Sequence, residues 1–200
     1  MDQLKTKNIL IAVSNKSAID GFLPLLEKNG TRIWATEGTA KYIREKGFEA
    51  ESIVSGFDFD GRVKSLDKLI LSRVLADKSK PRHLEELNKL GAAQGPALTV
   101  TRPVLVSEPF DAVVVELYKL EKANFPESMD IGGVTLIRAA IKNFENVALA
   151  FDEDSIGELT DHLRANQGST LLEFRKTQAK KAAEFIAKRT EQEADFLEQG

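Results

Sequence analysis

The stretch that decides the fold is Asn8–Ser14, which reads Asn-Ile-Leu-Ile-Ala-Val-Ser. An unbroken apolar run between two polar residues is typical of a β-strand that is covered on both faces. A helix-forming segment follows at once and ends at Asn29-Gly30, with Pro24 expected either early in the helix or at a kink. A buried strand followed directly by a helix is the repeating unit of an α/β fold with a parallel sheet.

The same alternation of strand and helix recurs along the chain. Apolar runs at Asp111–Tyr118 and Asn146–Phe151 predict two more buried strands. Residues 91–109 contain three prolines and little periodicity, which is compatible with strands broken by turns or with a protruding loop. The remaining predicted elements are a strand at 32–36, a turn at 37–39, a helix at 40–46, an extended segment at 48–54, a loop at 55–65, and helices at 66–77, at 82–90 and after Asp130.

From Ser155 onward almost every residue favours a helix. A first run with apolar residues at helical spacing ends at Gly168, and a second run continues to the end of the chain. We therefore expect one domain at residues 1–154 and a helical extension at residues 155–200 that packs on it. A long amphipathic helix at the C-terminus is also compatible with a homodimer.

Composition excludes several classes of function. The chain has 200 residues, 42% of them hydrophobic, and a net charge of −3, which argues against a nucleic-acid-binding protein. It contains no cysteine, and His83 and His162 have no second histidine at metal-ligand spacing, so a zinc or iron enzyme is not expected. Neither a signal peptide nor an apolar run of roughly 18 residues is present, so we expect a cytoplasmic protein without a membrane partner.

Two polar segments follow predicted strands and open predicted helices. They are Ser14–Ser17 (Ser-Asn-Lys-Ser) and Thr36–Thr39 (Thr-Glu-Gly-Thr). The start of a helix can hold a phosphate, and ligands of parallel sheets bind at the carboxyl ends of the strands. Ordinary helix caps explain either segment alone, and the sequence contains neither a Walker loop nor a GxGxxG motif.

Three other segments carry polar groups. Gly61–Ser65 brings two cations to one side of an extended loop, and Tyr118 ends a predicted buried strand. In Asp130–Asn143, Asp130 can cap a helix, the glycine pair admits a close ligand, and Lys142 shares a helix face with Arg138. Taken singly, these segments are equally compatible with a solvated loop, a core tyrosine and a capped helix with a basic edge.

Together, these segments resemble the IMP cyclohydrolase domain of the bifunctional purine biosynthesis enzyme. The resemblance runs from about Asn8 to Asp154 and lies in the order and spacing of five motifs, at residues 13–17, 36–41, 61–66, 117–118 and 130–143. It implies a three-layer α/β/α fold of the methylglyoxal-synthase-like type, with a mainly parallel central sheet. Residues 1–154 would then be the nucleotide-binding domain.

The resemblance also implies a reaction, in which 5-formamidoimidazole-4-carboxamide ribonucleotide closes to IMP with loss of water. It requires no metal or organic cofactor, and the implied partner is a small-molecule purine nucleotide. The catalytic residues implied are Lys142 as general acid/base, with Lys64, Tyr118 and Asp130. The residues implied to bind the nucleotide are Ser14, Lys16, Thr36, Gly38, Thr39, Arg62, Ser65, Glu116, Ile131 and Gly132.

The sequence departs from the family pattern at three acidic residues. Glu37 replaces a glycine, Asp67 a histidine and Glu116 an asparagine. A divergent nucleotide-binding regulatory module, without catalysis, is therefore the alternative. Methylglyoxal synthase itself would need a pocket histidine, for which no matching motif exists. The family's transformylase domain does not follow, so we expect either a fragment or a stand-alone cyclohydrolase.

One geometric condition applies to Asp130 and Lys142. Twelve residues of unbroken helix would separate them by roughly 18 Å, at about 1.5 Å per residue. They share one site only if the helix starts late, ends before Lys142 or bends. The lysine stem, which leans toward the helix N-terminus, recovers part of this distance.

Overall fold

The computed structural model describes residues 2–53, 66–93 and 108–198. Within these ranges, five parallel strands form one sheet in the order β4-β3-β2-β5-β6. The predicted parallel sheet is confirmed. The strands, in chain order, are β2 (Asn8–Val13), β3 (Arg32–Ala35), β4 (Glu51–Ser52), β5 (Ala112–Glu116) and β6 (Ala148–Ala150).

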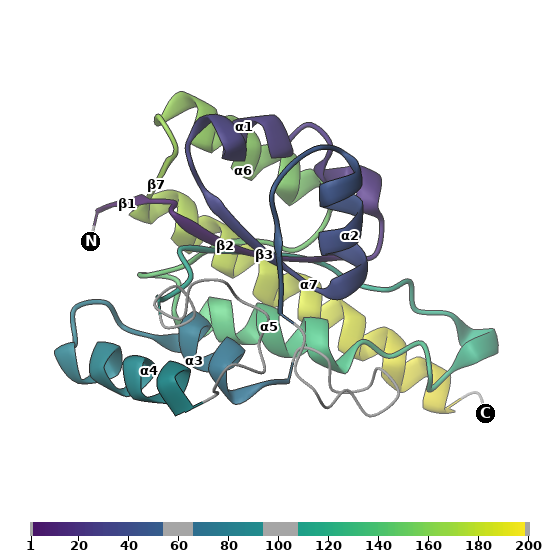
Figure 1. Cartoon of the computed structure of the whole chain (residues 1–200). Helices are drawn as coiled ribbons and strands as arrows, with labels where there is room; N and C mark the ends of the chain where they lie inside the picture. The colour runs from purple at the N-terminus through teal and green to yellow at the C-terminus, as the bar shows by residue number, and fades with distance from the viewer. Residues whose placement is uncertain (1, 54–65, 94–107, 199–200) are drawn as a thin grey trace.

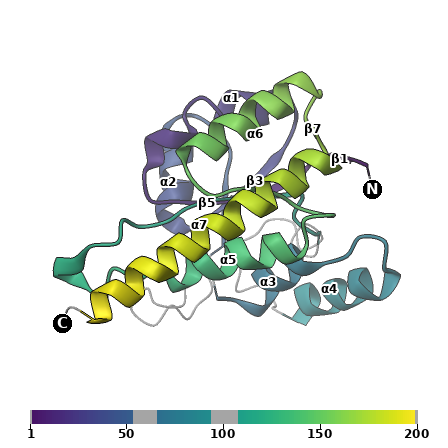
Figure 2. The ribbon, with the colours of Figure 1, turned by 180° about the vertical axis from the view of Figure 1, so that it is seen from behind.

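Helices cover both faces of the sheet and make three layers (Figure 1). One face carries α1 (Leu23–Lys28), α2 (Glu37–Glu45) and α6 (Glu153–Ala165). The other face carries α3 (Lys68–Leu75), α4 (Pro81–Ala93), α5 (Ile131–Lys142) and α7 (Leu172–Glu198). Seen from behind, α7 runs along the sheet beside α5 (Figure 2). This arrangement is the predicted α/β/α fold.

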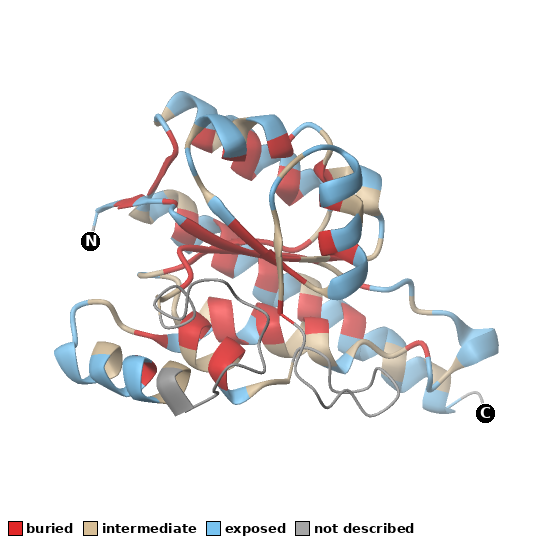
Figure 3. Ribbon diagram, viewed as in Figure 1, coloured by how far each residue is buried: buried red, intermediate tan, exposed pale blue. Residues whose placement is uncertain are grey.

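The central strand β2 explains why its sequence is apolar without interruption. Ile9 and Ile11 belong to the core under α1, α2 and α6, whereas Leu10 belongs to the core under α3, α5 and α7. All three side chains are fully buried, and the central strands of the sheet are mostly buried (Figure 3). Since successive residues of a strand point to opposite faces, a strand between two helical layers must be apolar at every position.

Several element boundaries differ from the prediction. The segment predicted as one helix after Ser14 is a 3-10 helix, η1 (Lys16–Ile19), followed by α1, and Pro24 lies in the first turn of α1. The turn predicted at 37–39 is wrong, because α2 begins at Glu37. Its glycine and threonine therefore form the first helical turn, not a loop. A further 3-10 helix, η4, spans Lys122–Asn124.

The C-terminal run is not purely helical either. After α6, Gln167 and Gly168 adopt positive φ angles of 53° and 78°, and β7 (Ser169–Leu171) pairs antiparallel with β1 (Gln3–Lys5). α6 and α7 then pack on opposite faces of the sheet, and the domain boundary placed at residue 154 stays a prediction. Among the described residues, no helix has both the length and the apolar composition needed to cross a membrane.

Candidate functional site at the carboxyl edge of the sheet

The carboxyl ends of β2 and β5 lie side by side. Val13 and Glu116 are register partners, and the Ser14 amide donates to the Glu116 carbonyl oxygen at 3.1 Å. The first predicted loop, which begins at Ser14, therefore starts beside the end of β5. This adjacency follows from the sheet order, because β5 is inserted between β2 and β6.

The first loop holds the carboxylate of Glu116. The Ser14 hydroxyl and the Asn15 amide both donate to Glu116 Oε2, the amide over 2.6 Å. The Asn15 side chain accepts from the Ser17 amide (3.2 Å) and hydroxyl (2.8 Å), which shapes the turn into η1. Two donors of the loop, the Ser14 hydroxyl and the Asn15 amide, are thus satisfied by an acidic side chain of the same chain.

Lys16 lies across the same loop. Its Nζ donates to the carbonyl oxygens of Val13 and, over 3.3 Å, Ser14. Partial burial lowers the pKa of Lys16, and the negative charge of Glu116 acts in the opposite direction. The lysine therefore places a half-buried cation beside the Glu116 carboxylate.

The second of the two predicted loops, Thr36–Thr39, forms the N-cap and first turn of α2, and it meets the first loop at the carbonyl of Val13. The Thr39 hydroxyl donates to that carbonyl oxygen at 3.4 Å, and the Thr36 hydroxyl donates to Thr39 Oγ1 at 3.1 Å. A Cβ atom on Gly38 would lie 4.0 Å from Lys16 Cε. Thr36 is the N-cap of α2 but makes no side-chain cap hydrogen bond, so it leaves the first-turn N–H groups of α2 uncapped by its hydroxyl. Ser14, Lys16, Thr36, Gly38, Thr39 and Glu116 are thus brought together.

Asp130 connects the start of α5 to the chain that leaves β5. One carboxylate oxygen accepts from the Gly133 amide at 2.7 Å, and the other accepts from the Tyr118 amide at 3.3 Å. A Cβ atom on Gly133 would lie 2.4 Å from Leu117 Cδ2 and 2.8 Å from Asp130 Oδ2, so only glycine fits there. The second glycine of the pair, Gly133, is therefore favoured by close packing between the start of α5 and the chain leaving β5.

Tyr118 and Ile131 stand next to this joint with exposed side chains. Tyr118 is 64% exposed and Ile131 is 53% exposed, although both side chains are large and hydrophobic. Gly132 lies between Ile131 and the buried Gly133. Tyr118, Asp130, Ile131 and Gly132 thus form a second group at the carboxyl end of β5, immediately after Glu116.

Lys142 is not brought to this group. α5 is one unbroken helix from Ile131 to Lys142, so its two ends lie roughly 18 Å apart. The next residue, Asn143, donates to the carbonyl oxygens of Val74 (2.8 Å) and Ala76 (3.0 Å) at the end of α3. The chain then enters β6, so Lys142 lies toward the amino ends of the strands. The helix therefore neither starts late nor ends before Lys142, which are two of the three conditions under which the residues could share a site.

The other predicted site residues cannot be placed. Arg62, Lys64 and Ser65 lie outside the described residues. Asp67, the third acidic departure, is the N-cap of α3 and accepts from the amides of Leu69 (2.7 Å) and Ile70 (3.2 Å). Its carboxylate therefore has a local structural role.

Glu153 is an acidic neighbour of the first loop that the sequence motifs do not predict. The Asn15 side-chain amide donates to Glu153 at the start of α6, so the first loop is tied to the helix after β6. The sequence prediction ends a strand at Phe151 and resumes with a helix at Ser155, and it assigns no role to Glu153. Because β6 also ends at the carboxyl edge, the same strand-end rule that selected Ser14 and Thr36 could have included Glu153.

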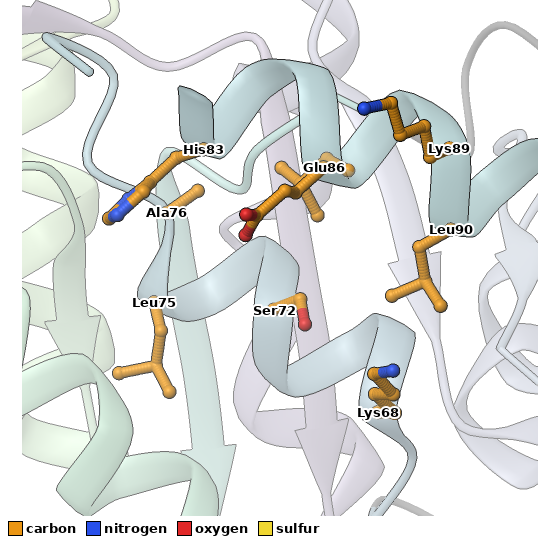
Figure 4. A pocket seen from close by; sticks show the side chains of 9 residues that line it. Lys68, Ser72, Leu75, Ala76, His83, Glu86, Lys89 and Leu90 are labelled. Atoms are coloured by element: carbon orange, nitrogen blue, oxygen red, sulfur yellow. The ribbon is translucent and has the colours of Figure 1, made fainter. Parts of the chain in front are cut away.

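A separate hollow lies between α3 and α4 (Figure 4). It has a volume of about 520 Å³ and contains none of the predicted site residues. Apolar side chains of Leu75, Leu87 and Leu90 line it, with Lys68 and Lys89 among its charged residues. Its lining among the described residues comes from α3, from Ala76 directly after α3, and from α4.

Comparison with known proteins places these motifs in a family. Residues 21–144 match the model of the MGS-like domain. The chain is 31% identical over 182 residues to the bifunctional purine biosynthesis protein PurH of Rhodopirellula baltica, with 84% of this chain and 32% of that protein aligned. The PurH of Brucella ovis is 31% identical over 193 residues, which cover 90% of this chain and 33% of that protein.

A solved structure, the crystal structure of ForH, has a similar fold over nearly the whole chain. The TM-score is 0.76 at 28% identity, with 96% of this chain and 99% of that chain covered. By contrast, the chain spans about a third of the length of the curated relatives. With its parallel sheet, its paired loops at the carboxyl edge and its match over residues 21–144, the chain belongs to the MGS-like domain family.

Proposed function

We propose that the chain is an IMP cyclohydrolase, which closes 5-formamidoimidazole-4-carboxamide ribonucleotide to IMP with loss of water. The observation that carries this proposal is the meeting of the two loops at the Val13 carbonyl, where Lys16 and Thr39 converge. The relatives named for purine biosynthesis support a purine nucleotide as the ligand. The match covers about a third of the length of these relatives, so it is a proposal that this chain carries out one of their activities.

The 5′-phosphate would lie between the two loops. Lys16 supplies a cation, and the hydroxyls of Thr36 and Thr39 supply donors. Gly38, in the first turn of α2, has no side chain to separate the backbone amides from a ligand. Ser14 and Glu116 border the same space from β2 and β5. This set would hold one end of the nucleotide.

The reacting end would lie beside Tyr118 and Asp130. In the reaction, the carboxamide nitrogen bonds to the formyl carbon and gives up one proton. The formamide nitrogen gives up a second proton as a C=N bond forms, and the formyl oxygen departs with these two protons as water. The exposed Tyr118 side chain could exchange a proton with the substrate, and the N–H groups of Ile131 and Gly132 at the start of α5 would stabilise developing negative charge. Asp130, held by two backbone amides, would position this group.

This arrangement gives no catalytic role to Lys142, although the resemblance implies that Lys142 is the general acid/base. Lys64, Arg62 and Ser65 remain proposed members of the site as the sequence motif implies. The chemistry needs no metal or organic cofactor, and a homodimer remains a proposal. No nucleic acid or membrane is involved in the proposed reaction.

A second candidate is a nucleotide-binding module without catalysis. Two observations favour it: Glu116 occupies donors of the first loop, and Lys142 lies at the far end of α5. Such a module would bind IMP but leave the formylated ribonucleotide unchanged.

Absorbance measurements of ring closure distinguish the two candidates. We expect turnover by the wild type and a loss of about 100-fold or more in Tyr118→Phe, if the hydroxyl transfers the proton. Tyr42→Phe is the matched control, because the Tyr42 hydroxyl donates to Asp20 at 2.7 Å in another part of the fold. A folded wild type that binds IMP in calorimetry but shows no turnover would replace the enzyme by the binding module.

Lys142→Ala belongs in the same assay. If one chain forms the whole site, we expect kcat/KM to fall by less than about threefold, because the lysine lies outside the group around Asp130. A loss as large as that of Tyr118→Phe, in a folded variant, would show that Lys142 reaches the substrate in an arrangement that this chain alone does not provide.

A further inference from the structure

The carboxylate of Glu116 occupies the position of a bound anion in the first loop. A single oxygen, Oε2, accepts from both the Ser14 hydroxyl and the Asn15 amide, the latter over 2.6 Å. Hydrogen bonds from neutral donors to a carboxylate are charge-assisted and stronger than those between neutral groups. The loop is therefore closed on an internal negative charge.

An incoming phosphate would use the same donors. Any phosphate oxygen that accepts from the Asn15 amide must take the place of Glu116 Oε2. If the side chain stayed, two negative groups would lie in contact, and like charges at such separations repel even in water. The carboxylate and the phosphate therefore compete for one position.

The structure allows the carboxylate to leave without disturbing the sheet. The backbone of Glu116 is fixed by its pairing with Val13 and by the Ser14 amide, but its side chain is only half-buried. Lys16 donates to two backbone carbonyl oxygens and not to the Glu116 carboxylate, so its hydrogen bonds do not hold the side chain in place. Rotation of one side chain would free the Ser14 and Asn15 donors.

We propose that Glu116 is a specificity-determining residue, whose carboxylate competes with the phosphate of the ligand for the Ser14 and Asn15 donors. The inference rests on the proposed function for the placement of the phosphate. Its consequence is selectivity: Glu116 weakens the binding of phosphate-bearing ligands and hardly affects a ligand that has the same base and sugar but no phosphate.

The test compares Glu116→Gln with Glu37→Gln. Both variants remove one negative charge from the carboxyl edge, but the Glu37 carboxylate accepts from the Ser52 hydroxyl at 2.5 Å and makes no hydrogen bond to the first loop. The glutamine at 116 keeps an oxygen that can accept from Asn15, so the loop retains its shape. Glu116→Ala, checked for an unchanged thermal transition, removes the competing group altogether.

The probes are inorganic phosphate, IMP and inosine. Calorimetry gives the affinities, and the amide NMR signals of Ser14–Ser17 report whether phosphate binds at the first loop. In Glu116→Gln we expect IMP and inorganic phosphate to bind about tenfold more tightly, equivalent to about 1.4 kcal/mol. Inosine affinity should change by less than about twofold in every variant. Glu37→Gln removes a solvated charge near the first turn of α2 without freeing the Ser14 and Asn15 donors, so it should tighten phosphate binding by no more than about threefold.

Different results separate this inference from the proposed function. Equal or weaker phosphate binding in Glu116→Gln and Glu116→Ala, or none at the loop in any variant, would refute competition by Glu116, even if the wild type turned over substrate. Tighter phosphate binding without turnover would support the inference and reject the enzyme. A comparable gain in Glu37→Gln would also refute it, because general charge and not the position of Glu116 would then control binding.

Discussion

Replacement of Gly133 by alanine tests the joint between β5 and α5. The new Cβ would lie 2.4 Å from Leu117 Cδ2 and 2.8 Å from Asp130 Oδ2, well inside van der Waals contact. Overpacking of this kind costs about 1–3 kcal/mol of unfolding free energy. The Asp130 carboxylate would also be pushed away from the Gly133 amide, and loss of an N-cap costs about 1 kcal/mol.

One term acts in the opposite direction, because alanine favours a helix over glycine by up to about 1 kcal/mol. The net loss expected for Gly133→Ala is therefore about 2 kcal/mol. For a chain of this length, it corresponds to a fall in Tm of about 4–8 °C. Urea denaturation, followed by circular dichroism, measures the free energy directly.

Gly157→Ala is the matched control. Gly157 lies in α6, and a Cβ there would meet no atom within 4 Å, so only the helix preference remains. We expect this variant to gain up to about 1 kcal/mol. If Gly133→Ala were as stable as Gly157→Ala, the close packing of Gly133 against Leu117 and Asp130 would be refuted as the reason for glycine.

Two further predictions concern ionisable groups away from the site. His162 Nε2 accepts from the Leu171 amide at 3.1 Å, and burial, followed by the nearby charge of Arg175, lowers the pKa of His162 below 6.5. The unfolded chain therefore binds this proton more readily, so the free energy of unfolding falls as the pH drops below about 6.5. The urea midpoints at pH 8 and pH 5.5 should differ less in His162→Gln than in the wild type. Equal differences in the two proteins would contradict the assignment to His162. Asp111 is buried and pairs with Lys78, so Asp111→Ala leaves a buried cation and should cost about 3–5 kcal/mol in urea denaturation. The exposed pair of Asp161 provides the control, since Asp161→Ala should cost less than about 1 kcal/mol, and equal losses would contradict the importance of burial.

The parts of the fold that the sequence predicts correctly are those in which local pattern and burial agree. The run at 8–14 is apolar because two cores meet on β2, and Pro24 takes the first turn of α1, where its missing N–H costs nothing. The strand β7 was missed because three residues, Ser169–Leu171, gain their partner from Gln3–Lys5 at the other end of the chain. No local pattern encodes a pairing between segments so distant in sequence.

The same distinction applies to the candidate site. The strand-end rule correctly predicts that the loops at Ser14 and Thr36 meet, because parallel neighbours end on one edge. It does not predict that the Glu116 side chain turns into the first loop. That contact depends on the pairing of Glu116 with Val13 and on the direction of one side chain, both of which require coordinates.

The stretch Asp130–Asn143 shows how one continuous motif can serve two separate places. Its first residues build the joint beside Tyr118, where Asp130 caps the helix and Gly133 packs without a side chain. Its last residue, Asn143, binds the end of α3 through Val74 and Ala76, roughly a helix length away. The stretch therefore combines a helix cap and close packing at one end with hydrogen bonds to the end of α3 at the other. A match to such a motif identifies the family, but it does not make every residue of the motif part of one site.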